Sequence, residues 1–326
     1  ETNGMQSGGY GLDEICDEAK KRIKEKLNCT TCDIHFLVGG TQCNQTVIAS
    51  ALRPYEAVIA ADGGHINVHE TGAIEATGHK VLVCEDRNGK VLSEGVRRIV
   101  EAHSDEHMVR PAMVYISDAT EIGTIYTKAE LQALREVCDA YGLYLYLDGA
   151  RLAMALVAED NDVTYEDLAR YCDVCYLGGT KCGALFGEAV VIFNDRLKEN
   201  FRYSIKQRGG MLAKGRLLGI QFRELFRDDL YLKLARHAVA MAQKLQKGMM
   251  ELGISFATPT STNQIFPILN DALLQAMKKH YLYQYWGKLD EDRHIVRLVT
   301  SWATKESAVD EFLAWLTSYR KQQERN

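Results

Sequence analysis

Residues 144–151 read Tyr-Leu-Tyr-Leu-Asp-Gly-Ala-Arg, an apolar run that ends abruptly in an acid and a glycine. A run that is apolar on both faces is typical of a strand buried between helices in a parallel sheet. Ligands of open parallel sheets bind beyond the carboxyl ends of the strands. The pattern would therefore place Asp148 in such a crevice, with about equal weight on a structural role in which Asp148 caps the next helix or pairs with Arg151.

Short apolar runs of the same kind recur along the first two thirds of the chain, with helical stretches between them. A capping box formed by Thr127 and Glu130 predicts the start of one helix. Alternation of strand and helix predicts an α/β fold with a mainly parallel, seven-stranded sheet. The predicted strands are 35–38, 57–61, 81–84, 113–116, 143–147, 174–177 and 190–193.

The pattern changes after about residue 205. Residues 212–251 are mostly helical in pattern, strand-like runs follow at 265–269 and 295–299, and a last helix is expected over about 305–320. We therefore predict a large α/β domain over residues 1–215. A connecting helix and a smaller C-terminal α+β domain would occupy residues 216–326.

Composition restricts the class of protein. The chain has 326 residues, of which 46% are hydrophobic and 25% charged, and its net charge is -5. These values exclude disorder of the whole chain and argue against a nucleic-acid partner. No run of about 18 apolar residues is present, so no membrane span is expected.

Cysteine usage points to a reducing compartment. The nine cysteines cannot all pair, and no apolar leader precedes them, so we predict a cytoplasmic protein. Cys29 with Cys32, and Cys172 with Cys175, have spacings that could bind zinc. We favour ordinary buried thiols, because residues three apart on a strand point to opposite faces, and we predict no metal site.

A second motif places a lysine after a buried strand. Residues 174–183 read Val-Cys-Tyr-Leu-Gly-Gly-Thr-Lys-Cys-Gly. One helix and a return strand fit between Asp148 and Lys181, so the two residues could lie at one edge of the sheet. Desolvation there would lower the lysine pKa and suit Schiff-base chemistry. The structural alternative is an ordinary lysine on a surface loop.

A third motif, Gly39-Gly40-Thr41, follows the first predicted strand and precedes an apolar helix. Glycines there let backbone N–H groups approach an anion, although a plain strand-to-helix turn fits equally. The motif lacks the Walker lysine and the dinucleotide spacing. Together with Asp148 and Lys181 it supplies what pyridoxal phosphate requires: a phosphate site, a partner for the pyridine nitrogen and a Schiff-base lysine.

On these motifs the sequence resembles the threonine aldolase and β-eliminating lyase family, whose members use pyridoxal phosphate in the aspartate aminotransferase-like fold. His65 with Glu70, within residues 64–73, and Arg297, within residues 296–300, also match the family pattern. The matches follow the family's order and cover nearly the whole chain.

The resemblance implies a role for each matching residue. Lys181 would form the Schiff base, Asp148 would face the pyridine nitrogen and His65 would stack on the ring. Arg151 and Arg297 would bind the substrate carboxylate. Lys214 would reach the active site of a neighbouring subunit. Cofactor binding is thus predicted at Gly39, Gly40, Thr41, His65, Asp148, Arg151, Thr180 and Lys181.

The sequence departs from the family at two places. The family opens with a short polar segment, including a residue near the substrate carboxylate, and we expect this sequence to begin after that segment. His69 stands where related sequences often carry an aromatic residue. It would be either a second base or a polar residue one turn from His65.

The resemblance implies a lyase acting on amino acids. We favour a low-specificity L-threonine aldolase that converts threonine or allo-threonine to glycine and acetaldehyde, because the segments around His65 and Arg297 resemble that branch more closely. The base would be His65, His69 or a water that they hold, with Lys181 and Asp148 as the other catalytic residues.

Two alternatives stay open. One is a β-eliminating lyase of the tryptophanase, tyrosine phenol-lyase or cysteine desulfhydrase type, because the same residues would serve it. The other is a non-catalytic binding subunit of the same fold, against which the intact set of Lys181, Asp148 and Arg151 argues. The resemblance also implies a homodimer or homotetramer with shared active sites.

Overall fold

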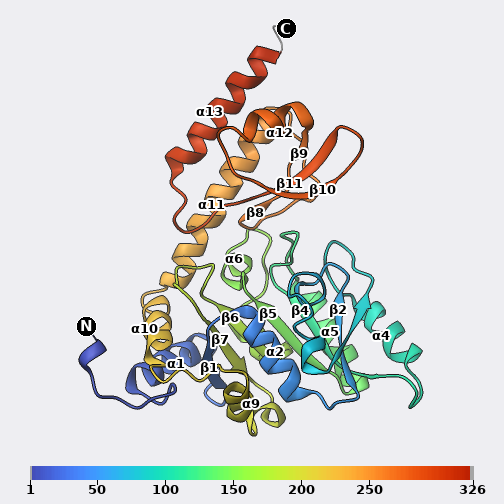
Figure 1. The fold of residues 1–326 in the computed structure, drawn as a ribbon, viewed down its shortest axis with the longest axis vertical. Helices are drawn as coiled ribbons and strands as arrows, with labels where there is room; N and C mark the ends of the chain where they lie inside the picture. Colours follow the sequence, from blue (N-terminus) through green and yellow to red (C-terminus); the bar gives the residue numbers. More distant parts are fainter. Residues whose placement is uncertain (1, 324–326) are drawn as a thin grey trace.

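The computed structural model describes residues 2–323 and contains two β-sheets joined by a long helix (Figure 1). The larger sheet has seven strands, as the sequence predicted. Its strands are β1 (Asp33–Leu37), β2 (Glu56–Ala61), β3 (Lys80–Cys84), β4 (Arg110–Ser117), β5 (Tyr144–Gly149), β6 (Val174–Gly178) and β7 (Glu188–Ile192).

The strand order of this sheet is β1-β7-β6-β5-β4-β2-β3. Strands β2 to β6 pair in parallel, whereas β7 runs antiparallel to both of its neighbours. The prediction of a mainly parallel sheet is confirmed. Parallel pairing brings the carboxyl ends of β4, β5 and β6 to one edge, where Ser117 lies opposite Asp148 and Asp148 opposite Tyr176.

Helices cover both faces of this sheet. The chain order of these elements is η1 (Thr2–Gly4), α1 (Glu14–Lys26), α2 (Gly40–Ala51), α3 (His65–Val68), η2 (Glu75–Thr77), α4 (Ser93–Ala102), α5 (Lys128–Tyr141), α6 (Leu152–Leu156), α7 (Tyr165–Tyr171), α8 (Asp195–Lys198), α9 (Phe201–Gln207) and α10 (Arg216–Leu225). The capping box predicted before α5 is present: Thr127 accepts from the Glu130 backbone N–H, and the Glu130 side chain accepts from that of Thr127.

Each face of the sheet has its own core, because successive residues of a strand point to opposite sides. Leu145 and Leu147 belong to the core beneath α1, α5 and α10, whereas Tyr146 between them belongs to the core beneath α2 and α9. Residues of the central strands are buried on both faces, which explains why their sequences are apolar throughout.

Helix α11 (Leu230–Glu251) links the two parts of the molecule. Its first half packs into the core of the large sheet through Ala235 and Ala238, and its second half packs into a separate core through Leu245 and Met249. That second core is completed by α12 (Asp271–Met277), α13 (Glu306–Gln323) and the strands β8 (Gln264–Ile265), β9 (Ile268–Asn270), β10 (Gln284–Lys288) and β11 (Arg293–Val299).

The small sheet differs from the sequence prediction in two respects. The run 265–269, predicted as one strand, is divided into β8 and β9 around Pro267, which lacks an N–H for a strand ladder. Strand β10 was not predicted, because its residues are mostly exposed and show no apolar alternation. The division of the chain at residue 215 stays a prediction, although α10 begins at Arg216.

The expectations about membrane spans and cysteines can be compared with the structure of residues 2–323. None of the helices within residues 2–323 is long and apolar enough to cross a membrane. The nine cysteines are free thiols; Cys29 is half-buried and the others are buried. Burial of Cys32, Cys172 and Cys175 agrees with the interpretation of the two Cys-x-x-Cys pairs as core residues.

Candidate active site

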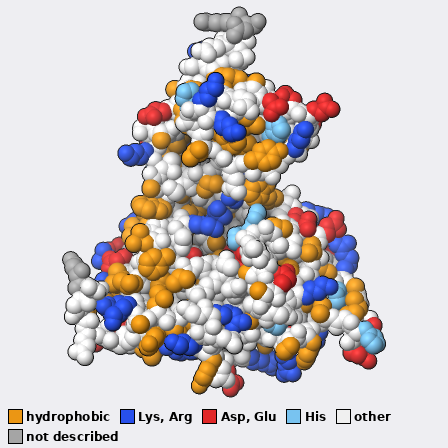
Figure 2. All heavy atoms as spheres, in the orientation of Figure 1, with side chains coloured by type: hydrophobic (Ala, Val, Ile, Leu, Met, Phe, Trp, Pro, Cys, Tyr) orange, Lys and Arg blue, Asp and Glu red, His pale blue; other side chains and the backbone are white. Residues whose placement is uncertain are grey.

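A cavity of about 440 Å³ lies between the carboxyl ends of the large-sheet strands and the small sheet. On the face seen in Figure 2, basic and histidine side chains are exposed where the molecule narrows between its two parts. The structure brings all nine predicted cofactor and substrate residues to the walls of this cavity, together with His69. They are Gly39, Gly40, Thr41, His65, Asp148, Arg151, Thr180, Lys181 and Arg297.

Lys214 is not part of this cavity within the chain. It is exposed on the segment between α9 and α10. Its predicted contact with a neighbouring subunit stays a prediction.

Asp148 is the centre of a buried hydrogen-bond network. Its Oδ2 accepts from Tyr115 Oη at 2.5 Å and from Asn44 Nδ2 at 3.2 Å. Its Oδ1 accepts from Tyr176 Oη and from the backbone N–H of Ala150 at 3.0 Å. Among residues 2–323, Asp148 forms no ion pair with Arg151, so this part of the structural alternative is not observed. Four donors from different parts of the chain fix the position of this carboxylate.

Close backbone approach at the strand ends explains how Asp148 reaches the cavity. A Cβ atom on Gly149 would lie 2.0 Å from the carbonyl oxygen of Tyr176, and one on Gly178 would lie 2.5 Å from that of Ala150. Only glycine permits this contact between β5 and β6. The glycines after each apolar run therefore bring the two strand ends together at the cavity.

Lys181 lies just beyond β6, in the wall of the cavity. Burial, with the positive charge of Arg151 second, lowers the pKa of its amine to about 8, and the charges of Asp148 and Glu188 oppose this shift. A lysine that loses its proton near neutral pH is a competent nucleophile toward a carbonyl.

Arg151 lines the cavity, and its guanidinium has hydrogen-bond donors that are not used within the described chain. Its buried Nε has no hydrogen-bond partner among the described residues. Burial and the nearby charge of Arg297 lower its pKa to about 10, which leaves it a cation at neutral pH. A buried cation with open donors fits an anionic ligand.

The N-terminus of α2 supplies the third motif. Gly39 is the N-cap residue and makes no side-chain cap, and Gly39, Gly40 and Thr41 all line the cavity. Gly40 is required for close packing, since a Cβ there would lie 2.8 Å from Tyr176 Oη. The uncapped N–H groups of a helix of this length suit a phosphate.

His65 is the first residue of α3. Its Nδ1 lies 2.7 Å from Glu70 Oε1, and the same oxygen accepts from Asn44 Nδ2 at 2.7 Å. Burial alone would lower the pKa of His65, but the bond to Glu70 and the charge of Asp148 raise it on balance. The ring of His69 lies 5.6 Å from that of His65, so the predicted neighbourhood of the two histidines is confirmed.

Arg297 is held in place by the small sheet. Its Nη1 donates to Gln264 Oε1 at 3.0 Å and its Nε to Gln284 Oε1 at 3.0 Å. Its guanidinium lies over the ring of Trp286 at 4.9 Å. Trp286 thus supports Arg297, whereas Tyr281, five residues earlier, packs against Phe312 in the core beside the small sheet.

Sequence reasoning missed several residues of this site. Glu121 and Glu188 both line the cavity, and burial raises the pKa of each, that of Glu188 to about 7. Asn44 connects Glu70 to Asp148. Glu121 lies in the segment after β4, and no local sequence pattern marked any of these three residues.

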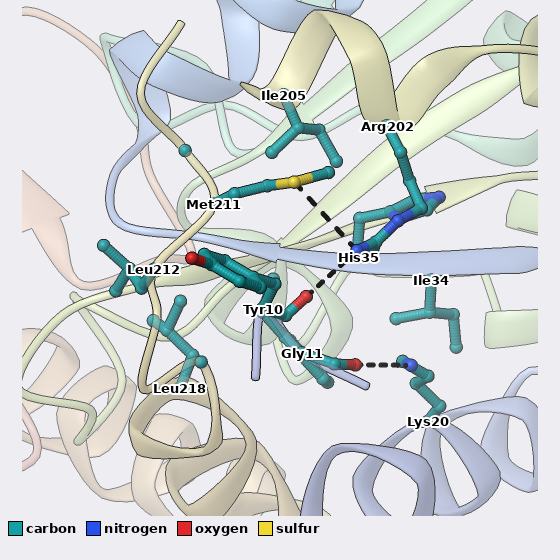
Figure 3. A pocket seen from close by; sticks show the side chains of 13 residues that line it. Tyr10, Gly11, Lys20, Ile34, His35, Arg202, Ile205, Met211, Leu212 and Leu218 are labelled. Atoms are coloured by element: carbon teal, nitrogen blue, oxygen red, sulfur yellow. Dashed lines mark hydrogen bonds between the residues drawn. The ribbon is translucent and has the colours of Figure 1, made fainter. Parts of the chain in front are cut away.

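A second cavity, of about 30 Å³, lies between the N-terminal segment and the loop after α9. Figure 3 shows the hydrogen bond that Lys20 donates to the carbonyl of Gly11. It also shows the hydrogen bonds that Arg202 donates to the carbonyl of Tyr10 and to the sulfur of Met211. A space of this size holds about one water molecule. It is too small for the cofactor.

The residues of the large cavity fit pyridoxal phosphate. Arg151 offers unsatisfied donors, the N-terminus of α2 offers uncapped N–H groups, and Lys181 offers an amine with a lowered pKa. No cluster of three or more His, Cys, Asp or Glu side chains arranged for a metal occurs among residues 2–323.

Comparison with solved structures defines the class of protein. The chain superposes on a threonine aldolase structure from Leishmania major with a TM-score of 0.96 and 46% identity, covering 98% of this chain and 93% of that one. An aspartate aminotransferase from Thermus thermophilus gives a TM-score of 0.69 at 15% identity, covering 95% and 82%. The predicted aspartate aminotransferase-like fold is confirmed.

Sequence comparison agrees. A low-specificity L-threonine aldolase from a Pseudomonas species is 31% identical over 313 residues, which cover 94% of this chain and 88% of that protein. The profile of the beta-eliminating lyase family matches residues 5–272. The chain belongs to the beta-eliminating lyase family.

Proposed function

We propose that this chain uses pyridoxal phosphate to cleave the Cα–Cβ bond of L-threonine or L-allo-threonine, giving glycine and acetaldehyde. One observation carries the proposal: the Lys181 amine, the Asp148 carboxylate and the incompletely bonded Arg151 guanidinium share one cavity with an uncapped helix N-terminus. The similarity to threonine aldolases over nearly the whole chain supports this reaction rather than another of the same fold.

Each group of residues has one task in holding the cofactor. Lys181 would bind it covalently, and Gly39, Gly40, Thr41 and Thr180 would surround its phosphate. When bound, the cofactor supplies an electron sink for a bond to Cα. Asp148 would keep the ring nitrogen protonated: two charges about 4 Å apart interact by about 4 kcal/mol at an effective dielectric of 20, equivalent to about three pKa units.

Arg151 and Arg297 would bind the substrate carboxylate and thereby select the bond that breaks. With the amine nitrogen fixed, rotation about the N–Cα bond decides which bond to Cα is aligned for cleavage. The two cations would set this rotation by fixing the carboxylate. Cleavage further requires a base for the β-hydroxyl proton. His65 and His69, which stand at the cavity wall, or a water that they hold, are the bases that the sequence suggested.

A substrate panel with two variants tests this proposal. Purified protein with cofactor is incubated with L-threonine, L-allo-threonine, L-tryptophan and L-cysteine, and the products are identified. Glycine and acetaldehyde from the first two are expected, with visible cofactor absorbance. Lys181→Ala should lose both the absorbance and turnover, whereas the exposed control Lys279→Ala should retain them.

Other outcomes would support the alternatives. Pyruvate from cysteine or tryptophan, without glycine from threonine, would favour a β-eliminating lyase. Protein that stays colourless with added cofactor would favour a binding subunit.

We also propose that the chain forms a homodimer or homotetramer in the cytoplasm. Tyr203 and Leu217, which flank the segment of Lys214, are exposed apolar side chains, and the nine free thiols suit a reducing compartment. Light scattering after size exclusion measures the assembly; a fully active monomer would contradict it.

A further inference from the structure

Glu121 lies in the segment between β4 and α5 and contributes a carboxyl group to the wall of the cavity. It is half-buried. Its Oε1 accepts two hydrogen bonds, from Ser117 Oγ at 2.7 Å and from the backbone N–H of His65 at 3.0 Å. These bonds fix the carboxyl group while its other oxygen, Oε2, takes part in neither. One oxygen is thus an anchor and the second is available to a ligand.

The charged side chains near Glu121 are the same residues that line the proposed substrate site. Its carboxyl interacts with the cations of Arg151 and Arg297, and with Asp148 and His65. In a β-hydroxy amino acid the hydroxyl oxygen is only a few bonds from the carboxyl carbon. A carboxylate bound by the two arginines therefore brings the β-hydroxyl near Glu121.

The two histidines are less suited to accept a proton. His65 already shares its Nδ1 with Glu70, and its pKa is raised, which increases the fraction of imidazolium that has no lone pair to offer. Burial and the nearby charges of His65 and Arg297 lower the pKa of His69, so its ring is neutral. The side chain is exposed, however, and no hydrogen bond among the described residues orients its ring, which lies 6.2 Å from that of Trp286. Glu121 lines the cavity and is anchored through Oε1, and its Oε2 accepts no hydrogen bond from another residue within 2–323.

We propose that Glu121 is the general base of the cleavage reaction, an assignment that rests on the proposed function. Its Oε2 would take the proton of the β-hydroxyl as the Cα–Cβ bond breaks. The hydroxyl oxygen becomes the aldehyde oxygen, and the electron pair of the broken bond remains with the glycine fragment. Lys181 then delivers a proton from solvent to Cα, which completes glycine, and Glu121 releases its proton to solvent, so that one proton is taken up from the solvent and one returned in each cycle.

Glu121→Gln separates this role from a structural one. The amide oxygen can replace Oε1 as the acceptor for Ser117 and His65, so folding should be retained, but the remaining NH₂ group cannot accept a proton. Removing a general base costs about 100-fold or more in kcat. We expect a loss of that size for threonine cleavage.

Exchange of the Cα proton of glycine with solvent deuterium is the second measurement. This exchange needs the cofactor and Lys181 but no β-hydroxyl base, so the variant should stay within about threefold of the wild-type rate. Visible cofactor absorbance and glycine affinity should be unchanged. Glu85→Gln, which alters an exposed carboxylate, serves as the matched control and should leave every readout unchanged.

The pH profile gives an independent readout. Burial raises the pKa of Glu121, so wild-type cleavage should fall as pH is lowered through that raised value, where the base becomes protonated. Glu121→Gln should lose this acidic limb, and Glu121→Asp should regain part of the activity and the limb with it.

Three results would overturn the assignment. They are cleavage by Glu121→Gln at the wild-type rate, parallel loss of glycine exchange and cleavage, and an acidic limb that persists in the variant. Wild-type protein that shows neither cofactor absorbance nor glycine exchange would instead refute the proposed function, and Glu121 with it. The two failures are therefore distinguishable.

Discussion

At the scale of single residues, Lys181 shows how the site changes the chemistry of a side chain. Burial is the largest influence and lowers its pKa, and the Arg151 cation adds to this effect. The carboxylates of Asp148 and Glu188 act in the opposite direction but do not cancel it. The amine is therefore a base of about pKa 8 rather than an ordinary lysine.

This pKa predicts how covalent attachment of the cofactor depends on pH. Only the unprotonated amine attacks an aldehyde, so the rate of attachment to cofactor-free protein should rise with pH and level off above about pH 8 to 9. Stopped-flow absorbance measures it. An ordinary, solvent-exposed lysine would place the midpoint near pH 10.5, which would contradict the prediction.

Arg151→Met provides a check on the cause. Removing the cation makes the protonated lysine less unfavourable, so the midpoint should move to higher pH. Arg98→Met, at an exposed position, should leave the midpoint unchanged.

At the scale of elements, the adjacent ends of β5 and β6 determine the geometry of the site. Asp148 and Gly149 pair with Tyr176 and Leu177 in parallel register. The tyrosine hydroxyl reaches Asp148, while its carbonyl oxygen faces the glycine at a distance that excludes a side chain. The position of the Asp148 carboxylate thus depends on the residue after it.

Gly149→Ala should destabilise the protein and displace Asp148. Because the added methyl would meet a backbone atom, the strands must separate, and overpacking of this kind costs about 1–3 kcal/mol. Denaturant unfolding measures the loss, and cofactor affinity measures the displacement. Gly4→Ala, whose Cβ would meet nothing within 4 Å, should change stability by less than about 0.5 kcal/mol.

The strands of the large sheet could be predicted from sequence, because its central strands are buried on both faces and are therefore apolar at nearly every position. The small sheet could be predicted only in part. Pro267 interrupts what the apolar run suggests is one strand, and β10 has an exposed, polar sequence that carries no strand signal.

The residues of the site likewise include some that could be predicted from sequence and some that could not. Asp148, Lys181 and Gly39-Gly40-Thr41 follow predicted strands, so topology alone could bring them together. Glu121, Glu188 and Asn44 act through contacts with residues far away in the chain, such as the bond from His65 to Glu121 or that from Asn44 to Asp148. Such contacts arise from tertiary packing and leave no local pattern.

At the scale of the whole molecule, the small sheet completes a site that the large sheet begins. Gln264 on β8 accepts from Arg297 and donates to the carbonyl of Thr120, one residue before Glu121. Thr262 likewise donates to the carbonyl of Gly123. Strand β8 and the residue two before it therefore contact both Arg297, the proposed substrate-binding arginine, and the segment of the proposed base.

Replacing Gln264 tests this connection, and two substitutions divide its parts. Gln264→Ala leaves Arg297 without one acceptor and the buried Thr120 carbonyl without a donor, which should cost about 1–3 kcal/mol of stability and raise KM for threonine. Gln264→Glu keeps the acceptor for Arg297 but loses the donor to Thr120, so it should restore KM more fully than kcat. The exposed control Gln132→Ala should change neither. If both Gln264 variants keep wild-type KM and kcat in steady-state assays, the small sheet does not organise the site in this way.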